Sequence, residues 1–272
     1  MSRGLMIGRP GIPGSAKSTF VRSAQRVARS AGKKLAVALT WPSEADGYDK
    51  DDARIEFKAD ELISELFWDD KFLPDLDLWE ANGYGKLLRW VYGMRDNKEV
   101  GIVAIDTMNG ADELIVHETT KMGRVRTLKE VGEYGLGFQK HDAAFQQLLQ
   151  AAQVVTLSGK HFIGTWHVKM KEREGAGDAK EIKAGQLVDY KFEDRLLPVL
   201  ATPLRQQVDG VFSLWLHSDM DTTGQLTTYK VVATPREAIP GKSRYAFDQK
   251  RAPGGRCDND FKTVLDAIGW TP

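Results

Sequence analysis

The chain has 272 residues, in which 38 Lys and Arg balance 38 Asp and Glu, and 42% of its residues are hydrophobic. This length and apolar content predict one large α/β domain with a sizeable core. The single cysteine, Cys257, excludes an intrachain disulfide and fits a reducing compartment. We find no signal peptide, no lipidation motif and no apolar run long enough to cross a bilayer, so we expect a cytoplasmic protein without a membrane partner.

The zero net charge hides an uneven distribution along the chain. Residues 1–43 contain eight Lys or Arg and no acid, whereas residues 44–80 contain fourteen Asp or Glu against four Lys or Arg. We expect the acidic stretch, at about residues 43–80, to be a solvated insertion. The alternative is a surface that contacts a basic neighbour or keeps nucleic acid away from one face.

The most informative segment follows a short apolar strand, Leu5-Met6-Ile7, near the start of the chain. It matches the phosphate-binding pattern G-x-x-x-x-G-K-[S/T] except that alanine replaces the second glycine. Its residues are Gly11, Ile12, Pro13, Gly14, Ser15, Ala16, Lys17, Ser18 and Thr19. The next residues predict a helix, because apolar side chains recur at helical spacing: Phe20, Ala24, Val27, Ala28 and Ala31.

This strand, loop and helix together predict a nucleotide site. Successive backbone N–H groups of such a loop bind an anion, and the helix N-terminus adds partial positive charge. Lys17 can reach the β- and γ-phosphates, and the Ser18 hydroxyl can ligate Mg²⁺. The Ala16 methyl intrudes where glycine allows close backbone approach, so we expect slow hydrolysis. Replicative helicases of the MCM type look similar here, with Ala before the Lys.

Strands and helices then alternate along the chain. The predicted elements up to residue 190 are strands at 34–41, 100–106 and 161–166, helices near 59–67, 85–95 and 138–153, and polar connections at 107–135 and 168–190. This alternation predicts a mainly parallel sheet flanked by helices. It is the order found in RecA-type P-loop domains.

The last third of the chain changes character. Strands are predicted at 208–216 and 226–233, joined by a turn at 221–224, followed by a short strand near 244–248 and a helix near 259–268. We therefore predict one domain over residues 1–272. Its core spans residues 1–200 and includes the acidic insertion, and residues 201–272 add a β-hairpin and a β-rich part.

Asp106 ends a fully apolar strand. The carboxyl ends of parallel strands face the ligand crevice, so we predict that Asp106 holds Mg²⁺ as a Walker B carboxylate. A helix cap or turn residue is the alternative. Thr107 follows it, where many AAA+ motors have glutamate; RecA-type proteins place that glutamate after the strand that follows the P-loop helix. Glu44 lies there and is predicted to orient the attacking water, with Asp46 and Asp49 as alternatives.

Four segments together resemble the phage-encoded RecA-like ATPases of the Sak type: GIPGSAKST, VGIVAID, KHFIGTWH and the late KSRYAF. The resemblance covers about residues 3–250. It implies a RecA-like core, ATP and Mg²⁺, and a homo-oligomeric ring or filament on single-stranded DNA in the host cytoplasm. It further implies a role in annealing or strand exchange, with a single-strand-binding protein as a further partner. His167 would act as the γ-phosphate sensor.

The RecA arrangement also predicts two DNA-binding loops, after the strands that end at residues 106 and 166. The first would contain Lys121, Arg124, Arg126 and Lys129, and the second Lys169, Lys171, Arg173, Lys180 and Lys183. Both segments also carry acids, so ordinary solvated loops are the alternative. A cation from the adjacent subunit commonly completes such sites. Its candidates are Lys242, Arg244, Lys250 and Arg251.

We therefore expect an ATPase, stimulated by single-stranded DNA, that acts in homologous recombination or strand annealing. A non-hydrolysing, nucleotide-gated binding or scaffold protein is one alternative, since Ala16 and Thr107 depart from the usual motifs. A P-loop kinase for a small molecule is another, although the sequence shows no Arg-rich lid.

Overall fold

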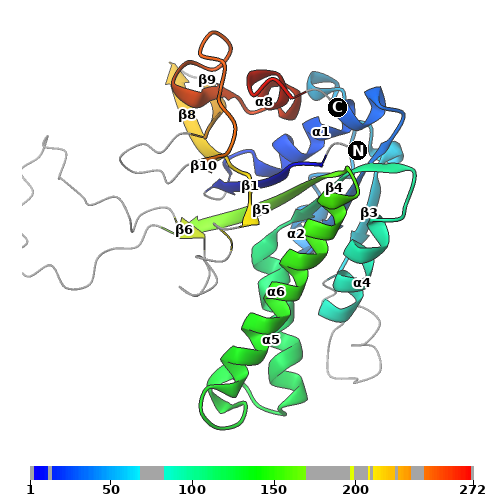
Figure 1. Cartoon of the computed structure of the whole chain (residues 1–272), viewed down its shortest axis with the longest axis vertical. Coiled ribbons are helices and arrows are strands. Elements are labelled where there is room, and N and C mark those ends of the chain that lie inside the picture. Colours follow the sequence, from blue (N-terminus) through cyan, green and yellow to red (C-terminus); the bar gives the residue numbers. More distant parts are fainter. Residues whose placement is uncertain are drawn as a thin grey trace, which may run out of the picture.

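The structure is a computed structural model of the chain. The residues that it describes are 3–11, 14–67, 83–169, 197–198, 208, 211–223, 226–233 and 242–270. Its centre is a parallel sheet (Figure 1). The six parallel strands, in spatial order, are β7 (Leu214–Trp215), β1 (Met6–Gly11), β5 (His161–Lys169), β4 (Val100–Asp106), β2 (Lys34–Leu39) and β3 (Ile63–Leu66). The predicted α/β fold with a mainly parallel sheet is confirmed.

Two short strands pair antiparallel with this sheet, β10 (Lys242–Ser243) with β7 and β6 (Leu197–Pro198) with β5. The strand predicted near residues 244–248 is thus shorter and earlier. A second, antiparallel sheet has the order β11 (Arg256–Asp258), β9 (Leu226–Val232) and β8 (His217–Thr223). β8 and β9 form a hairpin, with His217 opposite Val232. Its second strand matches the one predicted at 226–233. The first runs over 217–223, where the turn at 221–224 was expected, and the described part of the region predicted as a strand at 208–216 contains only the two-residue strand β7.

Helices cover both faces of the parallel sheet (Figure 1). One face packs against α1 (Lys17–Ser30) and α8 (Phe261–Ala267), and the other against α4 (Tyr84–Met94), α5 (Met108–Met122) and α6 (Leu136–Leu157). Neighbouring strand residues point to opposite faces of the sheet. Ile102 therefore packs in the core beneath α1 and α8, and Val103 packs in the core beneath α4, α5 and α6. This explains why the central strands read as continuous apolar runs.

The structure corrects two predicted elements. The helix expected near residues 59–67 is a single 3₁₀ turn, Ala59–Glu61, followed by β3, because pairing with β2 satisfies this backbone instead. The polar connection expected at 107–135 is mostly α5, which begins at a Thr107 cap and buries Met108, Ala111, Leu114 and Ile115. Short 3₁₀ turns also occur at Ala53–Ile55, Leu128–Glu130 and Pro253–Gly255.

The acidic segment is not a solvated insertion over its described part, residues 44–67. It packs along the basic side of α1, where three ion pairs join Arg22 to Asp52, Arg26 to Glu56 and Arg29 to Glu61. Tyr48 and Phe57, which belong to this segment, are buried. The contact with a basic neighbour was the alternative interpretation, and the neighbour lies in the same chain. Residues 68–82 lie outside the described residues.

Candidate functional site

The carboxyl ends of β1, β5 and β4 meet at one edge of the sheet. Gly11 lies opposite His167 in the register of β1 and β5, and Ile105 lies opposite Gly164 in β4 and β5. The strand that ends near His167 therefore lies between the strand of the phosphate-binding loop and the strand of Asp106. This order brings residues from four parts of the sequence to one crevice edge.

The phosphate-binding loop joins β1 to α1. Ala16 is the N-cap of α1, with φ 57° and ψ 35°, in the left-handed region that glycine would adopt freely. An alanine there costs about 1–2 kcal/mol. A Cβ on Gly11 would lie 2.2 Å from Ser15 Oγ and 2.3 Å from Ser218 Oγ, so this position requires glycine. Ile12 and Pro13 lie outside the described residues.

The Lys17 side chain lies folded against its own loop. It is 6% exposed, and its Nζ donates a hydrogen bond to the Gly11 carbonyl at 3.2 Å. Burial lowers the pKa of the Lys17 ammonium to about 8; the charges of Asp106 and Glu44 oppose this shift, and that of Arg9 reinforces it. A buried amine whose charge is this costly is well suited to an anionic ligand.

Asp106 is buried among three hydroxyl donors. Its Oδ2 accepts hydrogen bonds from Ser18 Oγ at 2.7 Å and from Tyr48 OH at 2.8 Å, and its Oδ1 accepts one from Thr165 Oγ1. The two predicted metal ligands, Ser18 and Asp106, are thus in direct contact although 88 residues separate them. Hydroxyl and carboxylate oxygens are the hard ligands that Mg²⁺ prefers, and protein Mg²⁺ sites typically use one or two carboxylates plus phosphate.

Glu44 lies on the short helix α2 (Pro42–Ala45), directly after β2. Its carboxylate accepts hydrogen bonds from Trp41 N at 3.1 Å and from Thr40 Oγ1 at 3.4 Å. Burial and then the negative charge of Asp106 raise the pKa of Glu44 to about 8. The two alternative acids, Asp46 and Asp49, are exposed.

His167 lies at the same edge. Its backbone N donates to Asn109 Oδ1 at 2.6 Å, and its buried Nδ1 has no hydrogen-bond partner among the described residues. Burial and then the charge of Lys17 lower the pKa of His167 below its ordinary value, against the opposing charge of Asp106. This shift favours the neutral imidazole, whose unpaired Nδ1 can donate to or accept from a ligand.

Sequence reasoning missed three residues of this cluster: Tyr48, Thr165 and Asn109. Thr165 could have been found, because it lies two residues before His167 in one strand and so shares its face. Nothing in the local pattern points to Tyr48, which comes from the acidic segment and reaches Asp106 across 58 residues.

The cations of the first predicted DNA-binding loop lie at and beyond the end of α5. Lys121 lies in the last turn of α5, and Arg124 and Arg126 follow it. The 15-residue helix α5 separates them from Asp106 by about 22 Å along its axis, where a polar connection was predicted. In the second predicted loop, Lys169 is the last residue of β5, and the others lie outside the described residues: Lys171, Arg173, Lys180 and Lys183. Among the candidates for the trans-acting cation, Lys242 is in β10, and Arg244, Lys250 and Arg251 are exposed.

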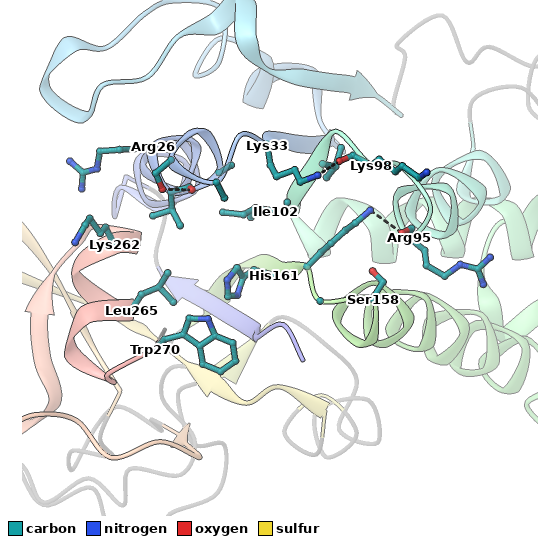
Figure 2. A pocket seen from close by; sticks show the side chains of 18 of the residues that line it. Arg26, Lys33, Arg95, Lys98, Ile102, Ser158, His161, Lys262, Leu265 and Trp270 are labelled. Atoms are coloured by element: carbon teal, nitrogen blue, oxygen red, sulfur yellow. Dashed lines mark hydrogen bonds between the residues drawn. The ribbon is translucent and has the colours of Figure 1, made fainter. Parts of the chain in front are cut away.

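A cavity of about 800 Å³ lies at the opposite, amino-terminal edge of the sheet (Figure 2). The side chains of His161, Leu265 and Trp270 lie along it. Five of the six lysines and arginines that line it are engaged, and the sixth, Lys98, has no side-chain partner among the described residues. Lys160 donates to the carbonyls of Met94, Arg95 and Asn97, Lys33 donates to that of Lys98, and Arg26, Arg95 and Lys262 pair with acids. Most of the positive charge that lines this cavity is therefore already compensated.

The chain was compared with known proteins. No family model matches it, and no curated protein matches it. Within the described residues, no helix is both long and apolar enough to cross a membrane.

Proposed function

We propose that the chain is a Mg²⁺-dependent ATPase with a RecA-like core that acts on single-stranded DNA in recombination or strand annealing. The observation that carries the proposal is the Ser18–Asp106 hydrogen bond, which joins the start of α1 to the end of β4. A hydroxyl and a carboxylate held together at a phosphate-binding loop form the protein part of a Mg²⁺–triphosphate site.

Two further observations fit a bound triphosphate. The buried Ser15 Oγ and His167 Nδ1 lack partners among the described residues, and a phosphate oxygen satisfies such groups. Lys17 is a buried cation next to the loop. When bound, Mg²⁺ would neutralise charge on the β- and γ-phosphates.

The roles of the remaining side chains follow from their positions. Ser18 and Asp106 would hold the metal, and Lys17 would bind the phosphate oxygens in place of the Gly11 carbonyl. Glu44 would orient the attacking water and accept its proton, a role supported by burial and the nearby charge of Asp106, which raise the pKa of this carboxyl. His167 would contact the γ-phosphate and pass its presence to the chain beyond β5.

The proposed single-stranded DNA surface is the turn between α5 and α6. Tyr134 is 94% exposed and Phe138 is 43% exposed there, close in sequence to the exposed Arg124, Arg126 and Lys129. Exposed aromatic rings stack on unpaired bases, and cations follow the phosphates. Since these residues lie a helix length from Asp106, α5 would transmit the state of the nucleotide site to the DNA.

The test is ATP turnover with and without single-stranded DNA. We expect turnover that requires Mg²⁺ and rises with DNA, together with an oligomer that forms in ATP. Turnover that needs a small acceptor instead would indicate a kinase and contradict the proposal.

The second candidate is a nucleotide-gated scaffold that binds ATP without hydrolysing it. It is favoured by Glu44, whose carboxylate is already engaged by Trp41 N and Thr40 Oγ1. ATP binding with no turnover at any DNA concentration would select this candidate. Glu44→Gln distinguishes the two, because it should abolish turnover in the first and leave binding unchanged in both.

A further inference from the structure

Arg9 is a fully buried arginine on β1, directly behind the phosphate-binding loop. Its guanidinium makes six hydrogen bonds. They run to Pro10 O at 2.9 Å, Leu216 O at 3.3 Å, Ser218 Oγ at 2.6 Å, Ser15 O at 3.3 Å, and Asn259 Oδ1 at 2.8 Å and 3.2 Å. Each of these acceptors is neutral, so the positive charge has no carboxylate partner in the described part of the chain.

This arrangement is costly for a free protein. A buried cation without a counter-charge loses its hydration, and Arg9 regains only neutral hydrogen bonds and a cation–π contact with the Phe20 ring, whose centroid lies 5.7 Å from Cζ. Burial lowers the pKa of Arg9 to about 9, so the side chain is still charged at pH 7. By contrast, Arg22, Arg26 and Arg29 on α1 each pair with an acid. An anion bound at the loop would supply the missing counter-charge.

The same side chain fixes carbonyl groups of the loop. Arg9 holds the carbonyls of Pro10 and Ser15, and Asn259 Nδ2 donates to the carbonyl of Ala16 at 2.8 Å. In a trans peptide the N–H points away from the C=O. Holding the carbonyls of Ser15 and Ala16 from behind therefore turns the N–H groups of Ala16 and Lys17 to the other side. It also holds Ala16 in its left-handed conformation.

We propose that Arg9 and Asn259 form a clamp that presets the loop N–H groups for a polyphosphate, while Arg9 adds a second buried positive charge to the site. Both are positioning residues that act through the loop backbone. Because Asn259 lies between β11 and α8, the clamp makes the C-terminal segment part of the nucleotide site. This inference rests on the proposed function, namely that the loop binds a triphosphate.

The test compares stability without ligand and affinity for inorganic tripolyphosphate and for Mg²⁺–ATP, by thermal unfolding and calorimetry on the full chain. Asn259→Asp places a carboxylate against the Arg9 guanidinium and removes the Nδ2 donor to the Ala16 carbonyl. A hydrogen bond between charged groups contributes more than the neutral one that is lost. We expect it to raise the unfolding temperature of the free protein and to weaken tripolyphosphate binding by about tenfold, the ratio that 1.4 kcal/mol produces. A merely structural role would move stability and affinity in the same direction.

Arg9→Met is the second variant, because it removes both the positive charge and the hydrogen bonds of the guanidinium without leaving a buried unpaired ion. We expect a larger loss of affinity than for Asn259→Asp. Arg95→Met, at an exposed arginine paired with Asp96 near the opposite edge, is the matched control and should keep wild-type affinity.

The outcomes separate the clamp from the proposed function. Wild-type affinity in Asn259→Asp or in Arg9→Met would overturn the clamp, as would an Asn259→Asp variant that loses stability and affinity together. If Lys17→Ala abolishes binding while both clamp variants bind normally, only the clamp fails. A wild-type protein that binds neither probe refutes the nucleotide site and the clamp with it.

Discussion

The two edges of the parallel sheet differ in how their polar groups are satisfied. At the amino edge, around the cavity of Figure 2, Lys160 and Lys33 cap carbonyls and the arginines pair with acids. At the carboxyl edge, Arg9 is buried without a carboxylate, Lys17 and Glu44 have shifted pKa values, and buried atoms of Ser15 and His167 lack partners among the described residues.

This difference shows that cavity volume alone does not locate a functional site. A hollow whose cations are mostly engaged gains little from a charged ligand. A crevice edge whose buried charges are incompletely compensated gains much, because an anion supplies interactions that the protein lacks. The predictions below test this contrast, from the largest expected effect to the smallest.

Replacing a lysine should affect turnover at the carboxyl edge and stability at the amino edge. Lys17→Ala removes the cation of the loop, and we expect ATP turnover to fall about 100-fold or more, the scale of losing one transition-state stabiliser. Lys160→Ala removes a cap on three carbonyls, and we expect a stability loss of about 1 kcal/mol with unchanged turnover. Turnover assays and urea denaturation of both variants check this. Equal turnover loss in the two variants would contradict the contrast.

The α5–α6 turn tests the proposed DNA surface. Replacing Arg124 and Arg126 by Ala should weaken single-stranded DNA binding, because two phosphate contacts are lost. The slope of log affinity against log salt concentration should become shallower by about 1.4 if each arginine meets one phosphate. Fluorescence anisotropy at several salt concentrations measures it. ATP affinity should not change, and an unaltered slope would exclude this surface.

Tyr48→Phe tests whether the acidic segment supports the metal carboxylate. The change removes the 2.8 Å hydrogen bond to Asp106 and leaves the ring in place. We expect a loss of about 1–2 kcal/mol in the free energy of unfolding, since the acceptor is charged, and a changed Mg²⁺ dependence of turnover. Tyr92→Phe, at a partly exposed tyrosine of α4, is the control and should change neither.

His141 provides a smaller, pH-dependent test. It is buried between α5 and α6, with Nε2 2.9 Å from Asp112 and Nδ1 3.2 Å from Asp142. Burial lowers its pKa, but the hydrogen bonds and charges of Asp112 and Asp142 outweigh this and raise the pKa above the ordinary value. Its stabilisation is therefore fully present below about pH 6.5 and is lost as pH rises through the raised pKa.

Urea denaturation at pH 5.5 and pH 8.5 checks this prediction. His141→Gln should destabilise the protein more at the lower pH than at the higher. Since His141 is already paired with Asp112 and Asp142, as the arginines of the amino edge are with acids, the turnover of His141→Gln at a fixed pH should stay near the wild-type value. A stability difference that does not depend on pH would show that folding leaves the pKa of His141 unshifted and would contradict the prediction.

The sequence alone determined the local units of this protein. Lys17 and Ser18 follow a strand and begin a helix, and Asp106 ends an apolar strand, as their patterns predicted. These signals are strong because backbone periodicity and the phosphate-loop pattern depend on residues only a few positions apart. The parallel sheet followed from the alternation of such units.

The tertiary structure decided everything that depends on distant pairs. The acidic segment contacts α1 instead of solvent, residues 63–66 form a strand because β2 offers an edge, and Tyr48 reaches Asp106. Arg9 meets Asn259 across 250 residues. No local pattern predicts such contacts, because whether a buried polar group is paired depends on which element the folded chain brings against it.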